Sequence, residues 1–575
     1  MLKGISGSSG FGIGKVFCYH AFDPSVQEKI VSPDEENTQR LSFFDALAQA
    51  KAELSSLVAS LPADKSAIFQ AHNEMLEDEA VLEEITDAIH SGSSAQWAVF
   101  SVFQTYIQLM QSQESAVMRE RAADLMDVRN RLLRLLRGEK ETSLAALTTP
   151  MVIAARDILP SDVARLNSAL VFAFLTETGG ATSHAAILAR GLGIPAVLGI
   201  PDLMNTLVDG QSVIVDGTAG LVLTDPDEAC LSAYRAKQAA YLAEQEQDRN
   251  CLPLSAETTD GVSVSLSLNI GSAELPELEC YADGVGLFRS EFLYMERETM
   301  PSEETQFAAY ANVLRVMGTR PVILRTLDIG GDKTLPCLPL PKEENPFLGN
   351  RAIRLCLNHE EIFRAQLRAA YRAASAGNLM IMFPMIGSVE DFRRAKSIAV
   401  SVWESLMQEG LSVPNVPLGI MIEIPAAALC AEQLAREADF ASIGTNDLCQ
   451  YTFAADRMNP AAAEYAHPLS RAMLKLVQMS ADAFSAAKKP LSVCGELAGE
   501  ARAIPLLLGA GVRKLSMSFS SLARAKRIVR ACSLSDCQIL FDAAMARATE
   551  QEILAQADAF LSSLNFEKVA ASAEK

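Results

Sequence analysis

The feature that most constrains this chain of 575 residues is an alternation of apolar, strand-like runs with helical patterns between about residues 262 and 519. Eight such runs follow one another, each with a helical pattern after it. Parallel strands need long crossovers, and eight β-α units in roughly 250 residues predict a (β/α)8 barrel. We expect its strands at 264–270, 284–288, 321–327, 379–386, 418–424, 440–445, 491–494 and 514–517.

Polar residues follow most of these predicted strands, where a barrel of this kind carries its active site. Any one of them would be an ordinary solvated loop charge, but a purely structural barrel does not need so many. Guanidinium forks suit phosphate and carboxylate oxygens. The arginines at or near the strand ends are Arg289, Arg325, Arg351 and Arg457.

Two carboxylates also follow neighbouring predicted strands. Glu423 ends one of them, and Asp447 comes just after the next, with Asn446 beside it. Two carboxylates together with substrate phosphate are a common way to hold Mg²⁺. With the arginines, they indicate a pocket for a small phosphorylated carboxylic acid and Mg²⁺.

Cys494 ends the seventh predicted strand, in the mouth of the expected pocket. A thiol in this position could pass a proton to a substrate. Cysteines in general more often serve as small buried hydrophobic groups. The position at a strand end favours the catalytic interpretation.

A second motif, Gly-Gly-Ala-Thr-Ser-His at 179–184, precedes the barrel. Its glycines give a tight entry to a short helix that Thr182 or Ser183 can cap and Gly191 can end. The positive end of that helix would disfavour a protonated His184 and favour an anion. A neutral imidazole is a nucleophile, so His184 is a candidate phosphoryl acceptor. The alternative is a capped helix with an incidental histidine.

The chain before the barrel divides into three parts. Strand-like runs in 1–20 and 145–224 predict one small α/β domain that contains His184. Between them, 21–144 has a helical pattern and predicts an inserted bundle without catalytic residues of its own, either structural or, as we favour, a docking surface. Residues 225–252 form a long polar helical linker to the barrel domain at 253–575.

Within the insert, helical spacing picks out several apolar faces. One includes Leu41, Phe44, Leu47 and Ala48, and it continues through Leu54, Leu57 and Val58. Another lies in 67–76, and a fourth helix, rich in arginine, is expected at 119–137.

Composition excludes several classes of protein. With 71 acidic and 50 basic side chains, the net charge is −21, which argues against nucleic acid or an anionic membrane surface as the main partner. No apolar run is long enough to span a membrane, and the N-terminus lacks the apolar core of a signal peptide. The 11 scattered cysteines include no CxxC pair, which argues against disulfides and structural zinc and favours a reducing compartment, the cytoplasm.

The glycines at 10–14 fit a turn better than a nucleotide-binding loop.

Several long motifs, in a fixed order, resemble those of phosphoenolpyruvate-utilising enzymes. The histidine motif is one, and the resemblance extends to the helical insert at 75–79 and 120–124. Among these enzymes, the chain is most similar to enzyme I of the bacterial phosphoenolpyruvate–sugar phosphotransferase system. The barrel motifs lie at 286–293, 344–354, 442–451, 454–457 and 493–499.

The resemblance implies a fold and a first half-reaction. The fold would be a phosphohistidine α/β domain with an inserted helical bundle, followed by the barrel. His184 would take the phosphoryl group of phosphoenolpyruvate, and Cys494 would protonate the enolate to give pyruvate. Arg289, Arg325, Arg351, Asn446 and Arg457 would bind the substrate, and Glu423 and Asp447 would hold Mg²⁺.

The resemblance also implies partners. Phospho-His184 would pass its phosphoryl group to a histidine of the carrier protein HPr, docked on the helical insert. The histidine domain would swivel on the linker between barrel and carrier, and the barrel would form a homodimer. Relatives with a large ATP-binding domain need more room than the 183 residues before His184 provide, and no sensory or carrier domain is expected at either end.

Some positions depart from the enzyme I pattern. Ala181 and Leu159 stand where arginine and threonine are common near the histidine, and Cys449 and Met458 replace a usual threonine and glycine. These departures affect the expected rate more than the reaction class. Two alternatives stay open: a regulatory paralogue that phosphorylates a different carrier, and a non-catalytic scaffold.

Overall fold

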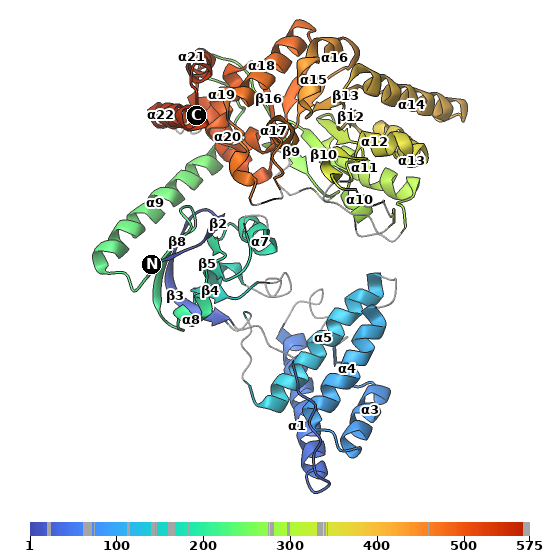
Figure 1. The fold of residues 1–575 in the computed structure, drawn as a ribbon, viewed down its shortest axis with the longest axis vertical. Helices are drawn as coiled ribbons and strands as arrows, with labels where there is room; N and C mark the ends of the chain where they lie inside the picture. The colour runs from blue at the N-terminus through green and yellow to red at the C-terminus, as the bar shows by residue number, and fades with distance from the viewer. Residues whose placement is uncertain are drawn as a thin grey trace. The chain divides into compact units, whose positions relative to one another are not determined.

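The computed structural model describes two compact units, Met1–Ala243 and Glu244–Lys575, drawn as ribbons in Figure 1. Sixteen strands and the helices around them account for most of the described chain. The described residues are 1–19, 25–60, 72–73, 75–111, 116–139, 144, 147–158, 167–180, 183–273, 275, 281–295, 299–330, 337–338, 341, 343–457, 459 and 461–566.

The first unit contains an eight-stranded mixed sheet with the spatial order β1-β8-β7-β3-β4-β5-β6-β2. β3 and β4 pair in parallel, although the whole helical segment lies between them in the chain. This confirms the predicted small α/β domain with an inserted helical bundle. The strands are β1 (Leu2–Lys3), β2 (Ile5–Ser8), β3 (Phe11–Tyr19), β4 (Met151–Ala155), β5 (Val171–Thr176), β6 (Ala196–Leu198), β7 (Ser212–Asp216) and β8 (Leu221–Thr224).

The central strand β4 shows how this sheet is buried. Its side chains alternate between the two faces, as strand geometry requires. Val152 and Ala154 pack into one core, together with α8 (Leu203–Thr206). Ile153 packs into the other core, which is completed by the alanines of α7 (His184–Leu192). The helix that begins at His184 is therefore fixed to the sheet by its apolar face.

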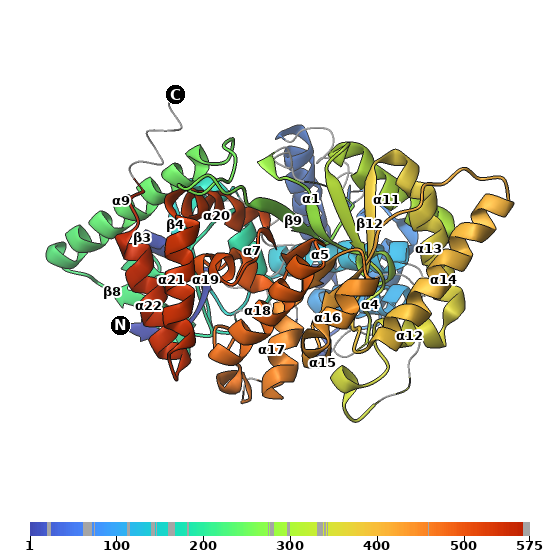
Figure 2. The same cartoon turned by 90° about the horizontal axis from the view of Figure 1, so that it is seen from above.

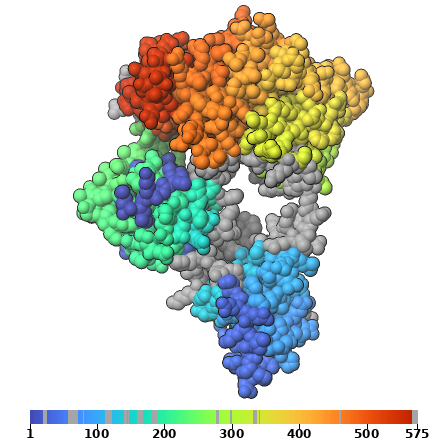
Figure 3. All heavy atoms as spheres, in the orientation of Figure 1, coloured from blue at the N-terminus to red at the C-terminus, as the bar shows by residue number. Residues whose placement is uncertain are grey.

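The helical segment comprises α1 (Glu36–Ser60), α3 (Glu79–His90), α4 (Ala95–Gln111) and α5 (Ala116–Arg137), which appear as one packed body of side chains in Figure 3. The prediction for the buried face of α1 was partly wrong. Phe43 is buried, whereas Leu41 and Phe44 are 61% and 45% exposed. The helix carries two apolar stripes, and tertiary packing selects the one that runs through Phe43 and Leu54. Most of the face expected in 67–76 lies outside the described residues.

The long polar helix expected at 225–250 is α9 (Glu228–Asn250), which has no buried residue. Its first half packs on the sheet of the first unit, where Tyr234 and Tyr241 meet the ring of Phe11 edge-on. Its last turns belong to the second unit, where Glu244 pairs with Arg527 of α20 (Phe519–Ala531) at 2.6 Å.

The second unit is built on a closed barrel of eight parallel strands, and each predicted strand overlaps an observed one. One detail differs, because no helix is described between the first two barrel strands, a segment in which 274 and 276–280 lie outside the described residues. The strands are β9 (Ser265–Ile270), β10 (Val285–Arg289), β11 (Pro321–Arg325), β12 (Asn378–Phe383), β13 (Leu418–Ile422), β14 (Ala441–Ile443), β15 (Leu491–Val493) and β16 (Lys514–Met517).

Helices surround this barrel, and the last ones pack tightly on one side (Figure 2). A Cβ atom at Gly509, the end of α19, would lie 2.2 Å from the carbonyl oxygen of Cys537 in α21, so only glycine fits there. The helices are α10 (Phe292–Met295), α11 (Glu303–Met317), α12 (Ile353–Asn358), α13 (Glu360–Ala373), α14 (Val389–Gln408), α15 (Pro425–Leu429), α16 (Ala431–Glu437), α17 (Thr445–Phe453), α18 (Arg471–Ala486), α19 (Ala503–Gly509), α20, α21 (Leu534–Met545) and α22 (Glu550–Ser563). None of the described helices in either unit has the length and apolar character needed to cross a membrane.

Candidate active site

His184 is the first residue of α7. The Ser183 hydroxyl caps this helix by accepting a hydrogen bond from the Ala186 amide at 3.4 Å, as one of the two predicted caps. The predicted stop at Gly191 was wrong, because Gly191 is still helical and the chain turns at Gly193, in the left-handed conformation with φ 67°. Thr182 and the two departures at Ala181 and Leu159 lie outside the described residues.

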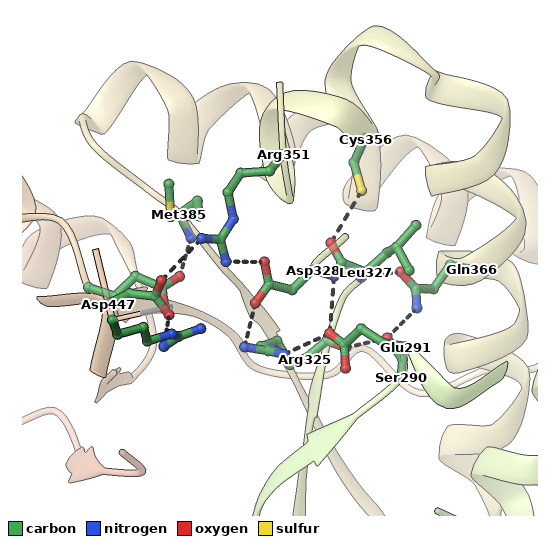
Figure 4. A network of polar contacts seen from close by, with 12 residues as sticks. Ser290, Glu291, Arg325, Leu327, Asp328, Arg351, Cys356, Gln366, Met385 and Asp447 are labelled. Atoms are coloured by element: carbon green, nitrogen blue, oxygen red, sulfur yellow. Dashed lines mark hydrogen bonds and ion pairs between the residues drawn. The ribbon is translucent and has the colours of Figure 1, made fainter. Parts of the chain in front are cut away.

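In the barrel, a network of charged side chains lies where the strands end (Figure 4). Arg325, the last residue of β11, is buried and pairs with Glu291 and Asp328, each at 2.7 Å. Burial opposes the charge of Arg325, but Asp328 and Glu291 outweigh it and raise the pKa of the guanidinium. Arg325 is thus a permanently charged group held by two carboxylates.

Arg351 extends this network towards the next strands. Its guanidinium pairs with Asp328 at 2.9 Å and Asp447 at 3.1 Å, and it donates to the Tyr451 hydroxyl at 3.2 Å. The neighbouring Ala352 has φ 54°, a conformation that costs an L-residue free energy. Strain of this kind persists where the surrounding structure demands it, and here it lies directly beside a residue of the site.

Asp447 lies in the first turn of α17, directly after β14. Besides Arg351, it faces Arg457, whose Nη1 lies 3.5 Å from Oδ2 of Asp447. Asn446, beside it, accepts a hydrogen bond from the Glu496 amide at 3.0 Å and so ties the loop after β15 to the loop after β14.

Glu423 follows β13 directly and is 1% exposed. Its Oε1 accepts a hydrogen bond from the Met385 amide at 2.6 Å. Burial, and after it the charges of Asp447 and Asp328, raise the pKa of Glu423 to about 8. Three carboxylates therefore converge here, balanced only in part by Arg325 and Arg351.

Cys494 follows β15 and is 2% exposed. Its thiol donates to the carbonyl oxygen of Ile443 at 3.7 Å, and burial raises its pKa to about 11. The thiol is therefore protonated at neutral pH, as a proton donor must be. The charge of Arg289, the exposed last residue of β10, is among those that act on this thiol.

The carboxylates fit a divalent cation. Among the described residues, no three Asp, Glu, His or Cys side chains form a ready-made metal site. Glu423 and Asp447 instead offer two hard oxygen ligands, and a cation between them would relieve the repulsion that raises the pKa of Glu423. This leaves most coordination positions to water or substrate oxygens, which is how Mg²⁺ is usually held.

The structure thus brings the predicted barrel residues to one end of the barrel, whereas His184 lies in the other unit. Sequence reasoning gave no role to Glu291 and Asp328, which the structure makes the counter-ions that hold Arg325 and Arg351. It missed Gln366 of α13, which accepts from the Leu327 amide at 2.9 Å and is buried. A lone glutamine in a helix gives no signal in a single sequence.

Comparison with known proteins agrees with this geometry. Residues 245–534, which include the whole network, match the PEP-binding domain of PEP-utilising enzymes. Residues 3–121 match the N-terminal domain of these enzymes, and 147–220, with His184, match their mobile domain. The chain belongs to the family of PEP-utilising enzymes. Enzymes of this family need a divalent metal ion.

Curated members of the PEP-utilising family are similar along nearly the whole chain. A phosphoenolpyruvate-protein phosphotransferase from Priestia megaterium is 42% identical over 96% of this chain and 98% of its own length. The Bacillus subtilis (strain 168) protein of the same name is 41% identical over the same shares. An NMR solution structure of an Enzyme I protein is 34% identical over 42% of this chain and 99% of its own, with a TM-score of 0.37.

Proposed function

We propose that this enzyme is a phosphoenolpyruvate-protein phosphotransferase, which moves the phosphoryl group of phosphoenolpyruvate to its own His184 and then to a carrier protein. The observation that carries the proposal is the convergence of arginines, two buried carboxylates and a protonated thiol at one end of the barrel. A trianionic phosphorylated enol needs cationic clamps and, once its phosphoryl group has left, a proton.

The arginines bind the substrate. Arg325 and Arg351 are held by carboxylates in the resting enzyme, so their positions are fixed before phosphoenolpyruvate arrives. Arg289 and Arg457 are more exposed and close on the substrate from the rim, where Asn446 adds a polar side chain next to Asp447. Such fixed charges stabilise the charge that develops as the phosphoryl group leaves.

His184 is the nucleophile. It is the first residue of α7, and in this step an imidazole nitrogen of His184 attacks phosphorus. The bond between phosphorus and the enol oxygen breaks, and the enolate takes a proton at carbon from Cys494 to give pyruvate.

Glu423 and Asp447 would hold Mg²⁺, which would neutralise charge on the substrate oxygens. The raised pKa of Glu423 means that its carboxyl group gives up a proton as the cation binds.

The remaining roles follow the division predicted from the sequence. Residues 1–20 and 145–224 carry the phosphohistidine, 21–144 dock an HPr-like carrier, and 225–252 connect them to the dimerising domain at 253–575. The exposed Leu41 and Phe44 of α1 support an apolar docking surface. The ten described cysteines, all free, support a cytoplasmic location.

The test is incubation with Mg²⁺ and ³²P-labelled phosphoenolpyruvate, followed by peptide mapping in alkali. We expect label on the peptide that contains His184 and an equal amount of pyruvate. His184→Ala should take up no label, whereas His359→Ala, in the barrel unit, should behave as the unchanged protein. Label on another residue, or none on a folded protein, would refute the proposal.

A further inference from the structure

Inside the barrel, next to Cys494, two hydroxyl groups lie on neighbouring strands. Ser442 of β14 and Ser492 of β15 are register partners, and both are buried. Their strand neighbours Ile443 and Val493 pack outwards against the helices. Since side chains alternate along a strand, the two serines face the barrel interior, on the same side as Cys494.

The three groups follow one another on the same face of the two strands. The Ser492 hydroxyl donates to Oγ of Ser442 at 2.9 Å, with the Ala441 carbonyl oxygen as a second acceptor at 3.4 Å. Cys494 lies diagonally across from Ser442 in the register of the strands, and Ser442 lowers the pKa of the thiol, as a donor to a thiolate does. The order Ser492, Ser442, Cys494 is therefore the direction needed to deliver a proton to a thiolate.

The far end of the chain reaches a cavity at the amino ends of the strands. Ser492 lines it together with Ser267 and Ser516, and the exposed Lys514 stands at its mouth. Its volume of about 40 Å³ exceeds the roughly 10–15 Å³ that one water molecule needs. A water molecule in this cavity can therefore contact the Ser492 hydroxyl without entering the substrate pocket.

Apolar side chains pack around the sulfur, among them Leu287, Met421 and Phe440. A second polar chain also leaves the cavity: Ser516 donates to Asn269 at 2.6 Å, and Asn269 donates to the carbonyl oxygen of Cys494 at 2.9 Å. That chain ends on a backbone carbonyl, whereas the serine pair leads towards the sulfur.

We propose that Ser442 and Ser492 return a proton to Cys494 from water at the amino end of the barrel. This inference rests on the proposed function, in which Cys494 protonates the enolate. In that step the S–H bond breaks and a C–H bond forms at the enolate carbon. The thiolate then takes the proton of Ser442, Ser442 takes that of Ser492, and Ser492 takes one from water. The two serines are positioning residues, since neither touches the substrate.

The experiment uses the reversibility of the first half-reaction, so that no carrier protein is needed. The full-length enzyme is incubated in D2O with Mg²⁺, phosphoenolpyruvate and ¹³C-labelled pyruvate. Two rates are measured: transfer of ¹³C from pyruvate into phosphoenolpyruvate, and entry of deuterium into the methyl group of pyruvate. The ratio of the second rate to the first reports how often Cys494 exchanges its proton with solvent during one cycle.

Ser492→Ala should keep carbon exchange close to the wild-type rate, because the same proton can pass back and forth between the thiol and pyruvate without exchanging with solvent. Deuterium entry per carbon exchange should fall by about tenfold or more, a modest part of what acid–base catalysis contributes. Ser442→Ala should do the same, and Ser492→Thr should restore the ratio. Ser267→Ala, which removes a hydroxyl from the same cavity, should leave it unchanged.

A general packing defect would lower both rates together and leave their ratio intact, which would overturn the relay. An unchanged ratio in both alanine variants would also overturn it. Failure of the proposed function is distinguishable, since carbon exchange would then be absent from the wild type or unaffected by Cys494→Ala.

Discussion

At the scale of single residues, the site shows how burial sets the protonation of its groups. Glu423 and Cys494 are both nearly inaccessible, and the pKa of each is raised. For the thiol this keeps a proton in place, and for the carboxyl it places a proton where a cation would bind. The arginines beside them stay charged because each has carboxylate partners.

Cys494→Ala should slow pyruvate formation by about 10²–10⁴-fold while weakening phosphoenolpyruvate binding little, because a general acid is lost but no clamp is. Rapid-quench measurement of pyruvate against phosphorylated His184 checks this. The matched control is Cys449→Ala, since burial raises the pKa of Cys449 to about 11 as well, but its side chain packs outside the barrel. Equal effects of the two variants would remove Cys494 from the mechanism.

Mg²⁺ affinity should rise with pH up to about 8. Below that value Glu423 is protonated, the cation must displace the proton, and apparent affinity falls by up to about tenfold per pH unit. To measure this slope of Mg²⁺ affinity against pH, the enzyme is titrated with Mg²⁺ at pH 6, 7, 8 and 9, and binding is read from the change in melting temperature. Glu423→Gln should abolish the slope, and Glu496→Gln, an exposed carboxyl in the same mouth, should keep it. A flat profile in the wild type would contradict the assignment.

At the scale of helices and strands, the ends of elements position the chemistry. Ser183 fixes the start of α7 and hence the place of His184, and Asp447 owes its position to the start of α17 directly after β14. These placements depend on a few backbone hydrogen bonds, so their contribution can be measured by local opening.

Ser183→Ala should destabilise the first turn of α7 by about 1 kcal/mol, or roughly fivefold in its opening equilibrium. Hydrogen exchange of the α7 amides in the full chain measures this directly. Ser302→Ala removes the equivalent cap of α11 and should accelerate exchange there but not in α7. Unchanged exchange in α7 would mean that packing of its alanines, and not the cap, fixes the helix start.

Elements whose pattern is local could be predicted from the sequence. Features that depend on contacts between distant parts of the chain could not. The barrel strands are apolar runs bounded by turns, so their positions were predictable. The buried face of α1 was not, since Leu41 and Phe43 are equally good candidates until the other helices are placed. The end of α7 was missed because two glycines, Gly191 and Gly193, offer the same stop.

The same limit applies to the site. Arg325 and Glu423 were predictable because they end barrel strands, where active sites lie. That Asp328 would join Arg325 to Arg351 depends on loop conformations, including the strained Ala352. Hydroxyls such as Ser442 and Ser492 give no signal until their strands are paired.

At the scale of the whole molecule, α9 contributes side chains to both compact units. Tyr234 and Tyr241 pack on the first unit, whereas Glu244 and Asp248 pair with Arg527 in the second. The helix itself buries no side chain completely, so these contacts at its two halves are what attach it.

Calorimetry should therefore show two unfolding transitions, one for each unit. Arg527→Ala should lower the stability of the second unit by about 3 kcal/mol, because it leaves the carboxylate of Asp248 without its buried partner. Arg235→Ala removes an exposed pair with Glu228 on the same helix and should change neither transition measurably. A loss spread equally over both transitions would mean that the units unfold as one.

The strand order of the first unit has a consequence for how molecules meet. β1 and β2 are separated only by Gly4, yet they form the two opposite edges of the sheet. Open edges invite strands of other chains, and β-proteins avoid aggregation by covering them. Here the first eight residues supply both edge strands, which pair with β8 on one side and with β6 on the other. Because β1 has two residues and β2 has four, each edge that this sheet offers to a strand of another chain is short, which disfavours the addition of a further strand.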